Sequence, residues 1–463
     1  MSHTTFSKWF DSFQKQAKLL NERRLIILVG DDVWANALLQ TVHSFIYVSN
    51  EKAEKSWLIY GDNELIRANV SSQRYRDKLG TESDFVVFTE QELTVDAFAS
   101  LSGTLVAGGI LFWLIDDLEL LKKSHFFKRF FSLIKGYSEH AILEQDSLIF
   151  PLLKSSSQAL DKYEINSVNS TKEQALTYGC ITQEQVSAVD AIMHVIEGRS
   201  KRPLVLTADR GRGKSSALAI ACARLLAEAK NDNKLHIIIT AAELNSVGIF
   251  FNQLAASLPQ GHSEGHKFLA HHGVVEFVAL DKLLKLPHKA SLVLVDEAAA
   301  IPVYILKQLL FSHSRMVFAS TIHGYEGAGR GFTLKFQQTL TSSFPHWRSL
   351  HINEPIRWRS SDPLEKLVFD ACLLNAELPS ISTQEEGRNL SISNSKLTFK
   401  HFHSTALVLN ENLLRQVFAV LVTAHYQTKP SDLQMLLDNK QVQLVCLMSG
   451  EEGGEHVVAV ALL

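Results

Sequence analysis

The sequence is poor in cysteine and has no apolar run of membrane-spanning length. Its four cysteines, Cys180, Cys222, Cys372 and Cys446, lie far apart and form no Cys-x-x-Cys pair. This spacing indicates reduced thiols rather than a disulfide or zinc framework. The longest apolar candidate, Leu105 to Ile115, is too short to cross a bilayer, and the N-terminus lacks the apolar core of a signal peptide. These absences predict a cytoplasmic protein with no membrane partner.

An excess of one charge is also missing. The net charge of −3 leaves no global footprint for nucleic acid, so any RNA-binding surface must be local. Hydrophobic residues make up 46% of the chain and charged residues 21%, which is a globular rather than a disordered composition. A chain of 463 residues exceeds a single hydrophobic core, so we expect roughly two to three domains.

The most informative segment is Thr207 to Ser216, which reads TADRGRGKSS between an apolar run and a stretch of helical periodicity. A strand, a glycine-containing loop ending in Gly-Lys-Ser and a helix form the layout of a phosphate-binding P-loop. Backbone N–H groups of such a loop favour an anion, Lys214 supplies a positive charge, and Ser215 supplies a hydroxyl for Mg²⁺. Ala208 stands where the first glycine of the loop is usual. An ordinary basic turn is the alternative, which the flanking strand and helix disfavour.

A second half of the site follows downstream. The continuous apolar run Leu292 to Val295 predicts a strand buried on both faces, and it ends directly in Asp296-Glu297. We expect Asp296 to hold Mg²⁺ together with Ser215, and Glu297 to orient or deprotonate the attacking water as the catalytic residue. A solvated strand end is the alternative. The two motifs together predict ATP binding and hydrolysis.

Other candidate residues of the nucleotide site are inferred only from their positions in the sequence. Thr321 and Arg330 lie in a glycine-rich stretch after a predicted strand and are candidate phosphate sensors, and Arg357 is a candidate arginine finger. Both arginines would fit equally as partners of local carboxylates. The amide of Gln185 would pair with an adenine edge, although a helix cap beginning at Thr182 explains this segment as well.

Four histidines lie between Gly261 and Gly273, without a helical frame or a cysteine beside them. This pattern favours an exposed insertion loop over a metal site. We therefore expect no metal cluster.

The pattern of apolar segments divides the chain into an N-terminal α/β domain of about 170 residues, an ATPase domain and a C-terminal part of different character. The strands expected in the first part are Leu25 to Val29, Trp57 to Tyr60, Phe85 to Phe88 and Ile110 to Ile115. Those expected in the second part are Leu204 to Thr207, His236 to Thr240, Val274 to Leu280, Leu292 to Val295, Met316 to Ser320 and Leu350 to Ile352. The last part predicts helices Leu413 to His425 and Ser431 to Asp438 and strands Gln441 to Met448 and Val457 to Leu463. Asn166 to Gln174 is the predicted linker between the first two parts. The chain stops inside an apolar strand, and we therefore expect that the sequence is cut short.

Several of these motifs together resemble the tRNA(Met) cytidine acetyltransferases. The resemblance is carried by TADRGRGKSS, DEAAAIP from Asp296, STIHGYEGAGRGF from Ser320, and EPIRW followed by DPLEK from Glu354. SLSGTLVAG from Ser100 and AHYQTKPSDL from Ala424 fit the same family. The resemblance covers nearly the whole chain and is far more specific than a P-loop alone.

The resemblance implies an enzyme that forms N4-acetylcytidine at the wobble position of elongator tRNA(Met). Acetyl-CoA would be the co-substrate of the full-length enzyme, with hydrolysis of ATP or GTP in the presence of Mg²⁺ and no DNA partner. It implies an α/β fold with a Rossmann-like N-terminal domain (1–170), a RecA-like helicase or ATPase domain (176–375) and the start of a GNAT α+β domain (376–463). The implied nucleotide contacts are Gln185, Gly211, Arg212, Gly213, Lys214, Ser215, Ser216, Ala217, Leu218, Ala219, Ile220 and Arg357.

One family feature is absent from the sequence. The Arg/Gln-x-x-Gly-x-Gly/Ala loop that holds acetyl-CoA does not occur, so no acetyl-CoA-binding residue is assigned and we expect no acetyl transfer by this chain alone. The alternative hypothesis is a stand-alone P-loop ATPase that remodels RNA, or an RNA-binding adaptor, without acetyltransferase activity.

Overall fold

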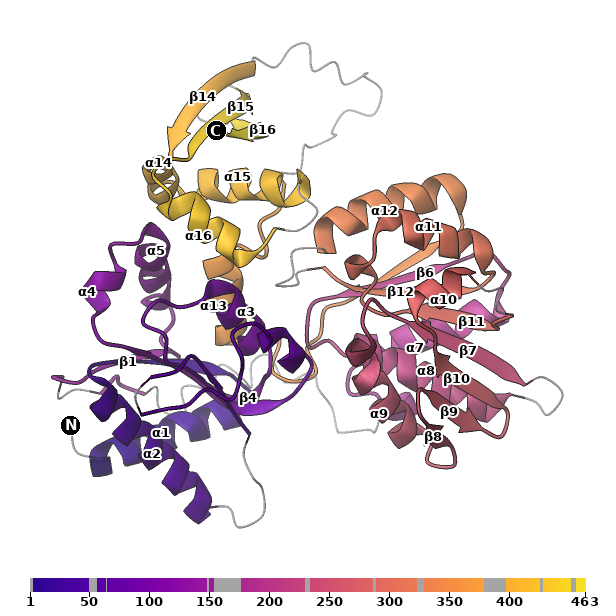
Figure 1. Ribbon diagram of the computed structural model, residues 1–463, viewed down its shortest axis with the longest axis horizontal. Helices are drawn as coiled ribbons and strands as arrows, with labels where there is room; N and C mark the ends of the chain where they lie inside the picture. Colours follow the sequence, from indigo (N-terminus) through magenta and orange to yellow (C-terminus); the bar gives the residue numbers. More distant parts are fainter. Residues whose placement is uncertain are drawn as a thin grey trace. The chain divides into compact units, whose positions relative to one another are not determined.

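The computed structural model describes residues 3–49, 56–63, 65–147, 150–153, 176–229, 234–285, 289–322, 329–378, 397–424, 428–450 and 455–463. These residues form two compact units, each containing a parallel β-sheet (Figure 1). The first unit draws on residues 1–155 and 361–463, and the second on 156–324 and 328–360. The linker predicted at Asn166 to Gln174 lies outside the described residues, and the three-domain division stays a prediction. None of the helices in the described ranges is long and apolar enough to cross a membrane.

The first unit is built on a five-stranded parallel sheet with the order β2-β3-β4-β1-β5. Its strands are β1 (Arg24–Val29), β2 (Trp57–Tyr60), β3 (Ser83–Phe88), β4 (Leu105–Ile115) and β5 (Ala141–Glu144). The four strands expected from the sequence are confirmed. The short β5 was not predicted, because four residues carry too little pattern to stand out.

Helices cover both faces of this sheet. Alternate residues of β1 point to opposite sides, with Leu25 in one hydrophobic cluster and Ile26 in another. The Ile26 side packs against α1 (His3–Leu19) and α2 (Asp32–Ser49), and the Leu25 side against α3 (Val95–Ser102), α5 (His125–Ile134) and α13 (Pro363–Cys372). The short elements α4 (Leu118–Leu121) and η1 (Tyr75–Lys78) complete this part.

Helix α13 is joined to the sheet by a fully buried ion pair. Arg23 Nη2 lies 2.9 Å from Asp362 Oδ1, and the backbone N–H of Arg23 donates to Asp362 Oδ2 at 2.6 Å. The ring of buried His140 bridges the same elements, since Nδ1 accepts from Leu25 N at 3.1 Å and Nε2 lies 3.2 Å from Pro363 O. Burial lowers the pKa of His140 to about 4, so the ring is neutral at pH 7. A segment that follows the predicted ATPase motifs in sequence therefore belongs to the N-terminal sheet.

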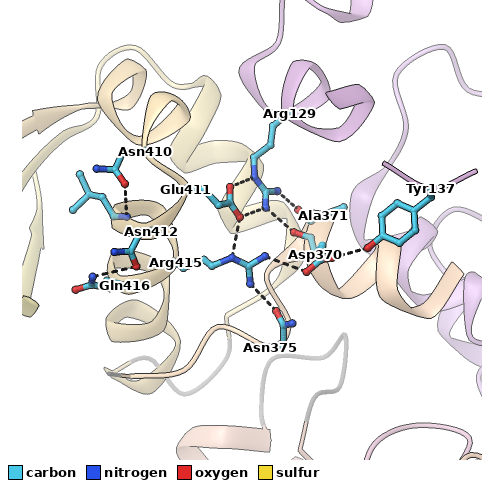
Figure 2. A network of polar contacts seen from close by, with 11 residues as sticks. Arg129, Tyr137, Asp370, Ala371, Asn375, Asn410, Glu411, Asn412, Arg415 and Gln416 are labelled. Carbon is cyan, nitrogen blue, oxygen red and sulfur yellow. Dashed lines mark hydrogen bonds and ion pairs between the residues drawn. The ribbon is translucent and has the colours of Figure 1, made fainter. Parts of the chain in front are cut away.

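A second polar network fixes the helices that follow (Figure 2). Arg129 on α5 makes two hydrogen bonds of 2.8 Å to the carboxylate of Glu411, the first residue of α15 (Glu411–Ala424). Arg415 donates to Glu411 at 3.0 Å and to Asp370 at 3.1 Å, and Tyr137 donates to Asp370 at 2.6 Å. Each carboxylate thus joins residues of different helices, and α5, α13 and α15 form one packed group.

The remaining elements of this unit are a small antiparallel sheet and two short helices. They are β14 (Leu397–His403), β15 (Gln443–Ser449), β16 (His456–Leu462), α14 (Ser404–Leu409) and α16 (Pro430–Asp438). The predicted helices and strands at 413–463 agree with α15, α16, β15 and β16 within a few residues, while β14 was missed.

The second unit contains an eight-stranded sheet with the order β13-β6-β12-β11-β7-β10-β9-β8. Its first six strands are parallel, and β9 and β8 are antiparallel additions at one edge. The strands are β6 (Leu204–Ala208), β7 (Leu235–Thr240), β8 (His262–Glu264), β9 (Lys267–Ala270), β10 (Gly273–Phe277), β11 (Leu292–Val295), β12 (Met316–Thr321) and β13 (Arg348–Ile352). All six strands predicted for this part are present, but the one predicted to end at Leu280 ends at Phe277, and Leu280 begins a helix. The histidine segment, predicted as a solvent-exposed insertion loop, is largely exposed as expected, but it forms the hairpin of β8 and β9 rather than an irregular loop. These two strands are too short to give a strand pattern.

Two helical layers enclose this sheet (Figure 1). The helices α7 (Gln183–Glu197), α8 (Lys214–Glu228) and α9 (Gly248–Ser257) bury their apolar faces in one cluster. The helices α10 (Leu280–Lys285), α11 (Val303–Ser312) and α12 (Gly329–Ser343) contribute to the other. The short helices η2 (Thr177–Gly179), η3 (Leu244–Val247) and η4 (Ala298–Ala300) lie in the connections.

Candidate nucleotide site

The strand order brings the predicted site residues together. Strand β12 lies between β6 and β11 and runs parallel to both, so the carboxyl ends of these strands are neighbours. The predicted P-loop follows β6, Thr321 ends β12, and Asp296 follows β11. Residues more than 100 positions apart in sequence therefore meet at one edge of the sheet, where open parallel sheets bind ligands.

The loop after β6 requires glycine at two positions. Gly211 and Gly213 both have a φ of +77°, a left-handed conformation that glycine adopts without strain. A Cβ atom on Gly211 would lie 2.6 Å from the Trp358 ring, and one on Gly213 would lie 2.8 Å from Gln185 Nε2. Ala208, the substitute for the usual first glycine, is the last residue of β6 and is fully buried, so no turn is needed there.

Helix α8 begins at Lys214, with Gly213 in the capping position and no side chain bonded to the helix start. No capping side chain therefore occupies the first backbone N–H groups of the helix, an arrangement that suits an anion. Lys214 is buried, and its Nζ donates to the carbonyl of Asp209 at 3.4 Å. Buried Arg212 donates from Nη1 to the carbonyl of Arg210 at 3.1 Å. Positive charge is thus concentrated around the start of α8.

The rest of the predicted loop lies in the helix. Ser216 is half-buried in the first turn. The side chains of the next four residues are buried in the hydrophobic core beneath the sheet: Ala217, Leu218, Ala219 and Ile220. These four side chains hold α8 in place, which fixes the position of its N-terminus.

Asp296 and Ser215 form a direct pair. Ser215 Oγ donates to Asp296 Oδ2 at 2.8 Å, and the carboxylate is completely buried. Burial, and next the neighbouring charge of Glu297, raise the pKa of Asp296 to about 6, against the lowering effect of Ser215 and Lys214. A buried hydroxyl–carboxylate pair with raised pKa is an oxygen donor set for a hard divalent cation, so the residues present fit Mg²⁺.

Glu297 is held in an uncommon backbone conformation. Its φ of +46° is left-handed, and its N–H donates to Asp296 Oδ1 at 3.0 Å. Thr321 Oγ1 lies 3.1 and 3.2 Å from the two carboxylate oxygens of Glu297. Thr321 thus orients the carboxylate that was predicted to be catalytic. Arg330 lies in the first turn of α12, and its side chain is outside the described part of the chain.

The segment that carries Arg357 packs against the P-loop. Ile356 N donates to Gly211 O at 3.0 Å, and the ring of buried Trp358 lies against Gly211. Arg357, between them, is half-buried. Sequence reasoning missed Trp358 as a residue that shapes the loop, although its place beside Arg357 in EPIRW was a usable signal.

Gln185 is buried at the other side of the loop. Its Oε1 accepts from Ile181 N at 2.9 Å, and its amide nitrogen faces Gly213. Thr182 caps α7 by accepting from Gln185 N at 3.1 Å, so the capping alternative is present in the structure. The adenine contact stays a prediction. Glu184, not predicted, accepts from Glu354 N at 2.9 Å and ties α7 to the segment before Arg357.

Two family models match the chain. Residues 205–375 match the model of the RNA cytidine acetyltransferase NAT10/TcmA helicase domain, and residues 1–145 match that of the tRNA(Met) cytidine acetyltransferase TmcA N-terminal region. The chain belongs to the tRNA(Met) cytidine acetyltransferase family. This confirms the resemblance drawn from the sequence motifs.

Curated members of this family align over most of the chain. The tRNA(Met) cytidine acetyltransferase TmcA of Nitrosococcus halophilus is 34% identical over 96% of this chain and 60% of its own length. The TmcA of Vibrio cholerae is 36% identical over 94% of this chain and 56% of its own length. The chain thus spans somewhat less than two thirds of the length of these relatives. Among solved structures, the HK97 bacteriophage large terminase is 13% identical, covers 61% of this chain and 62% of its own, and has a TM-score of 0.30.

Proposed function

We propose that this chain provides the ATP-hydrolysing part of a tRNA(Met) cytidine acetyltransferase. The enzyme would form N4-acetylcytidine at the wobble position of elongator tRNA(Met), with acetyl-CoA as acetyl donor and with ATP or GTP hydrolysed in the presence of Mg²⁺. The observation that carries this proposal is the convergence of the P-loop, Asp296, Glu297 and Thr321 in a chain whose family acts on this RNA.

Each residue of the candidate nucleotide site would have a separate role in ATP binding or hydrolysis. The backbone of Gly211 to Ser216 and the ammonium of Lys214 would hold the nucleotide phosphates, with Ala217 to Ile220 as the buried support of the helix. Ser215 and Asp296 would hold Mg²⁺, which supplies charge stabilisation at the phosphate oxygens when bound. Glu297 would orient the attacking water, kept in place by Thr321, and Arg357 would face the charge that develops on the transferred phosphoryl group.

The finer fold assignment is part of the same proposal. We infer a Rossmann-like layer for the sheet of the first unit and a RecA-like layer for that of the second, where one strand separates the P-loop strand from the acidic strand. We assign α14 to α16 and β14 to β16 as the start of a GNAT domain. The four cysteines are free and buried, which supports a reducing, cytoplasmic setting.

A genetic experiment tests the proposed function. Deletion of the gene that encodes this chain should remove N4-acetylcytidine from elongator tRNA(Met), measured by mass spectrometry of the purified tRNA. The wild-type gene should restore the modification, and a Lys214→Ala gene that produces a folded protein should not. Persistence of N4-acetylcytidine in the deletion strain would contradict the proposal, and full restoration by Lys214→Ala would separate acetylation from the nucleotide site.

A further inference from the structure

The amino-terminal ends of the parallel strands in the second unit carry a cluster of basic side chains. These ends lie at the edge of the sheet opposite to the P-loop, since the P-loop follows the carboxyl end of β6. The basic edge, as we name it, consists of Arg199, Lys201, Arg202, Arg315 and Arg348. Lys201 N donates to Ser314 O at 2.7 Å, and Arg348 N donates to Pro203 O at 2.9 Å. The segments that lead into β6, β12 and β13 are therefore in direct contact.

The basic edge is nearly free of negative charge. The lead-in segments 197–203, 313–315 and 345–348 contain five Lys or Arg residues and one carboxylate, Glu197. Neighbouring strands lie about 4.8 Å apart, so three adjacent strand starts fall within about 10 Å. This distance is close to the screening length of about 8 Å at physiological salt, so the positive potentials of these side chains add. The result is a local basic surface on a chain whose net charge is −3.

Two of the five cations donate hydrogen bonds to backbone carbonyls at the ends of helices. Lys201 Nζ donates to the carbonyls of Leu310, Phe311 and His313 at 3.1 to 3.2 Å, which satisfies the end of α11. Arg315 Nη2 donates to Gly198 O at 3.2 Å, at the end of α7. Satisfying helix ends accounts for these two residues.

The other three cations have no such role. Within the described ranges of the chain, the side chains of Arg199, Arg202 and Arg348 form no hydrogen bond or ion pair. Arg199 and Arg348 are exposed, and Arg202 is half-buried. Three unpaired guanidinium groups repel one another, so their clustering lacks a stabilising reason within this part of the fold.

An exposed aromatic ring lies next to Lys201 of the basic edge, because Lys201 Nζ donates to the carbonyl of Phe311. Phe311, at the end of α11, is 57% exposed and touches Phe344 with a ring distance of 5.5 Å. Lys201 Nζ, from the basic edge, lies 5.8 Å from the centre of the Phe344 ring. An exposed ring on the same basic edge adds a stacking surface for a base to charges that suit a phosphate backbone.

We propose that the basic edge binds the phosphate backbone of RNA, with Phe311 as a stacking surface for an unpaired base. The identity of the nucleic acid as tRNA rests on the proposed function. Because the basic edge and the P-loop lie at opposite ends of the strands, RNA held there leaves the nucleotide site accessible.

The test replaces only the three cations without structural work. The triple variant Arg199→Glu, Arg202→Glu, Arg348→Glu is compared with a control triple of equal charge change, Arg67→Glu, Arg74→Glu, Lys123→Glu, on exposed positions of the first unit. Binding of an elongator tRNA(Met) transcript is measured by fluorescence anisotropy between 50 and 200 mM salt, with ATP turnover without RNA as the check of folding. The basic-edge variant should bind at least about ten-fold more weakly, and the slope of log affinity against log salt should fall by roughly two to three. The control triple should stay within about two-fold of wild type, and Phe311→Ala should weaken binding with little change of salt slope.

Three other results would contradict RNA binding by the basic edge. If both triple variants lose tRNA affinity equally, or neither loses any, the basic edge does not bind RNA, while the proposed function stands. Failure of the wild-type chain to bind tRNA(Met) at all contradicts both the basic edge and the substrate part of the proposed function. Tighter binding of poly-glutamate than of tRNA, lost in the basic-edge variant, would assign this surface to an acidic protein and overturn the RNA assignment.

Discussion

Both units place a parallel strand before a helix, but the two turns treat the start of that helix in opposite ways. In the turn after β1, Asp31 Oδ1 accepts from Trp34 N at 2.8 Å in the first turn of α2. Gln145 secures this arrangement, since it donates to Asp31 Oδ2 at 2.8 Å and accepts from Asp31 N at 2.8 Å. In the turn after β6, Gly213 precedes α8, and no side chain caps the helix.

The difference supports the proposal that the residues at the helix start, rather than the α/β fold, decide whether a turn can bind phosphate. The hydrogen bond from the Trp34 backbone, and next that from Gln145, lower the pKa of Asp31, so an ionised carboxylate already occupies the N-terminus of α2. The start of α8 instead has glycines, which leave room for phosphate, and a lysine, which attracts it. Of these two turns, the one after β6 therefore fits the proposed nucleotide site.

The largest expected effect comes from Glu297→Gln. The variant should lower ATP turnover by roughly two orders of magnitude and keep nucleotide affinity within a few-fold, because Glu297 acts on the water in the transition state. Steady-state phosphate release and calorimetric titration measure the two quantities. Asp31→Asn, a matched loss of carboxylate charge in the other turn, should leave turnover unchanged. Equal loss in both variants would remove the distinction between the turns.

Arg357→Ala should have a similar effect on turnover. The guanidinium would stabilise charge that develops on the transferred phosphoryl group, so turnover should fall by roughly two orders of magnitude with affinity within a few-fold. The same assays apply, together with the melting temperature. A lower melting temperature with unchanged turnover would show that Arg357 is a structural residue of the segment that packs on Gly211.

Asp296→Asn should stabilise the nucleotide-free protein locally, although it removes a proposed Mg²⁺ ligand. Folding raises the pKa of Asp296 from 3.8 to about 6, so the folded state binds more protons than the unfolded state between these values. Stability from this group is therefore complete below pH 3.8 and is lost as pH rises through 6. Removing the buried charge should raise the free energy of unfolding at pH 7 by on the order of 3 kcal/mol. Hydrogen exchange of the β11 amides measures this gain in free energy of unfolding, which should shrink as the pH falls towards 4. A gain that does not change with pH would show that the buried charge of Asp296 is not its cause.

The smallest expected effect comes from Asp31→Ala. Removing the cap should lower the melting temperature slightly, because Trp34 N loses its partner. It should create no nucleotide affinity, since the turn still lacks the lysine and the glycines of the P-loop. Calorimetric titration with ATP checks this expectation. Measurable ATP binding gained by Asp31→Ala would show that the carboxylate alone keeps phosphate out.

Strands with strong apolar patterns could be predicted from the sequence, and those with polar or short patterns could not. The run Leu292–Val295 identifies β11 directly. In contrast, β8 is three exposed polar residues, β9 is only four residues long, and β14 mixes Lys and His with apolar residues. The main residues of the candidate nucleotide site could also be predicted, because the P-loop and Asp296-Glu297 are short contiguous motifs.

Contacts between distant segments were beyond the sequence. The pairing of Arg23 with Asp362 spans 339 positions, and nothing in either local pattern indicates the partner. The EPIRW motif marks Trp358 as a candidate residue, but no local pattern indicates that its ring packs on Gly211. For these reasons the residues that support the P-loop emerged only with the structure.

We propose that the turn after β6 binds Mg·ATP through Lys214 and the uncapped start of α8. Calorimetric titration of the wild-type chain and of Lys214→Ala with ATP, in the presence and absence of Mg²⁺, tests it most directly. Charge-assisted contacts contribute about 1.5–3 kcal/mol, so Lys214→Ala should bind at least about ten-fold more weakly. Binding by the wild-type chain should also strengthen when Mg²⁺ is added, because Ser215 and Asp296 then gain their cation. An unchanged affinity in Lys214→Ala would contradict the account.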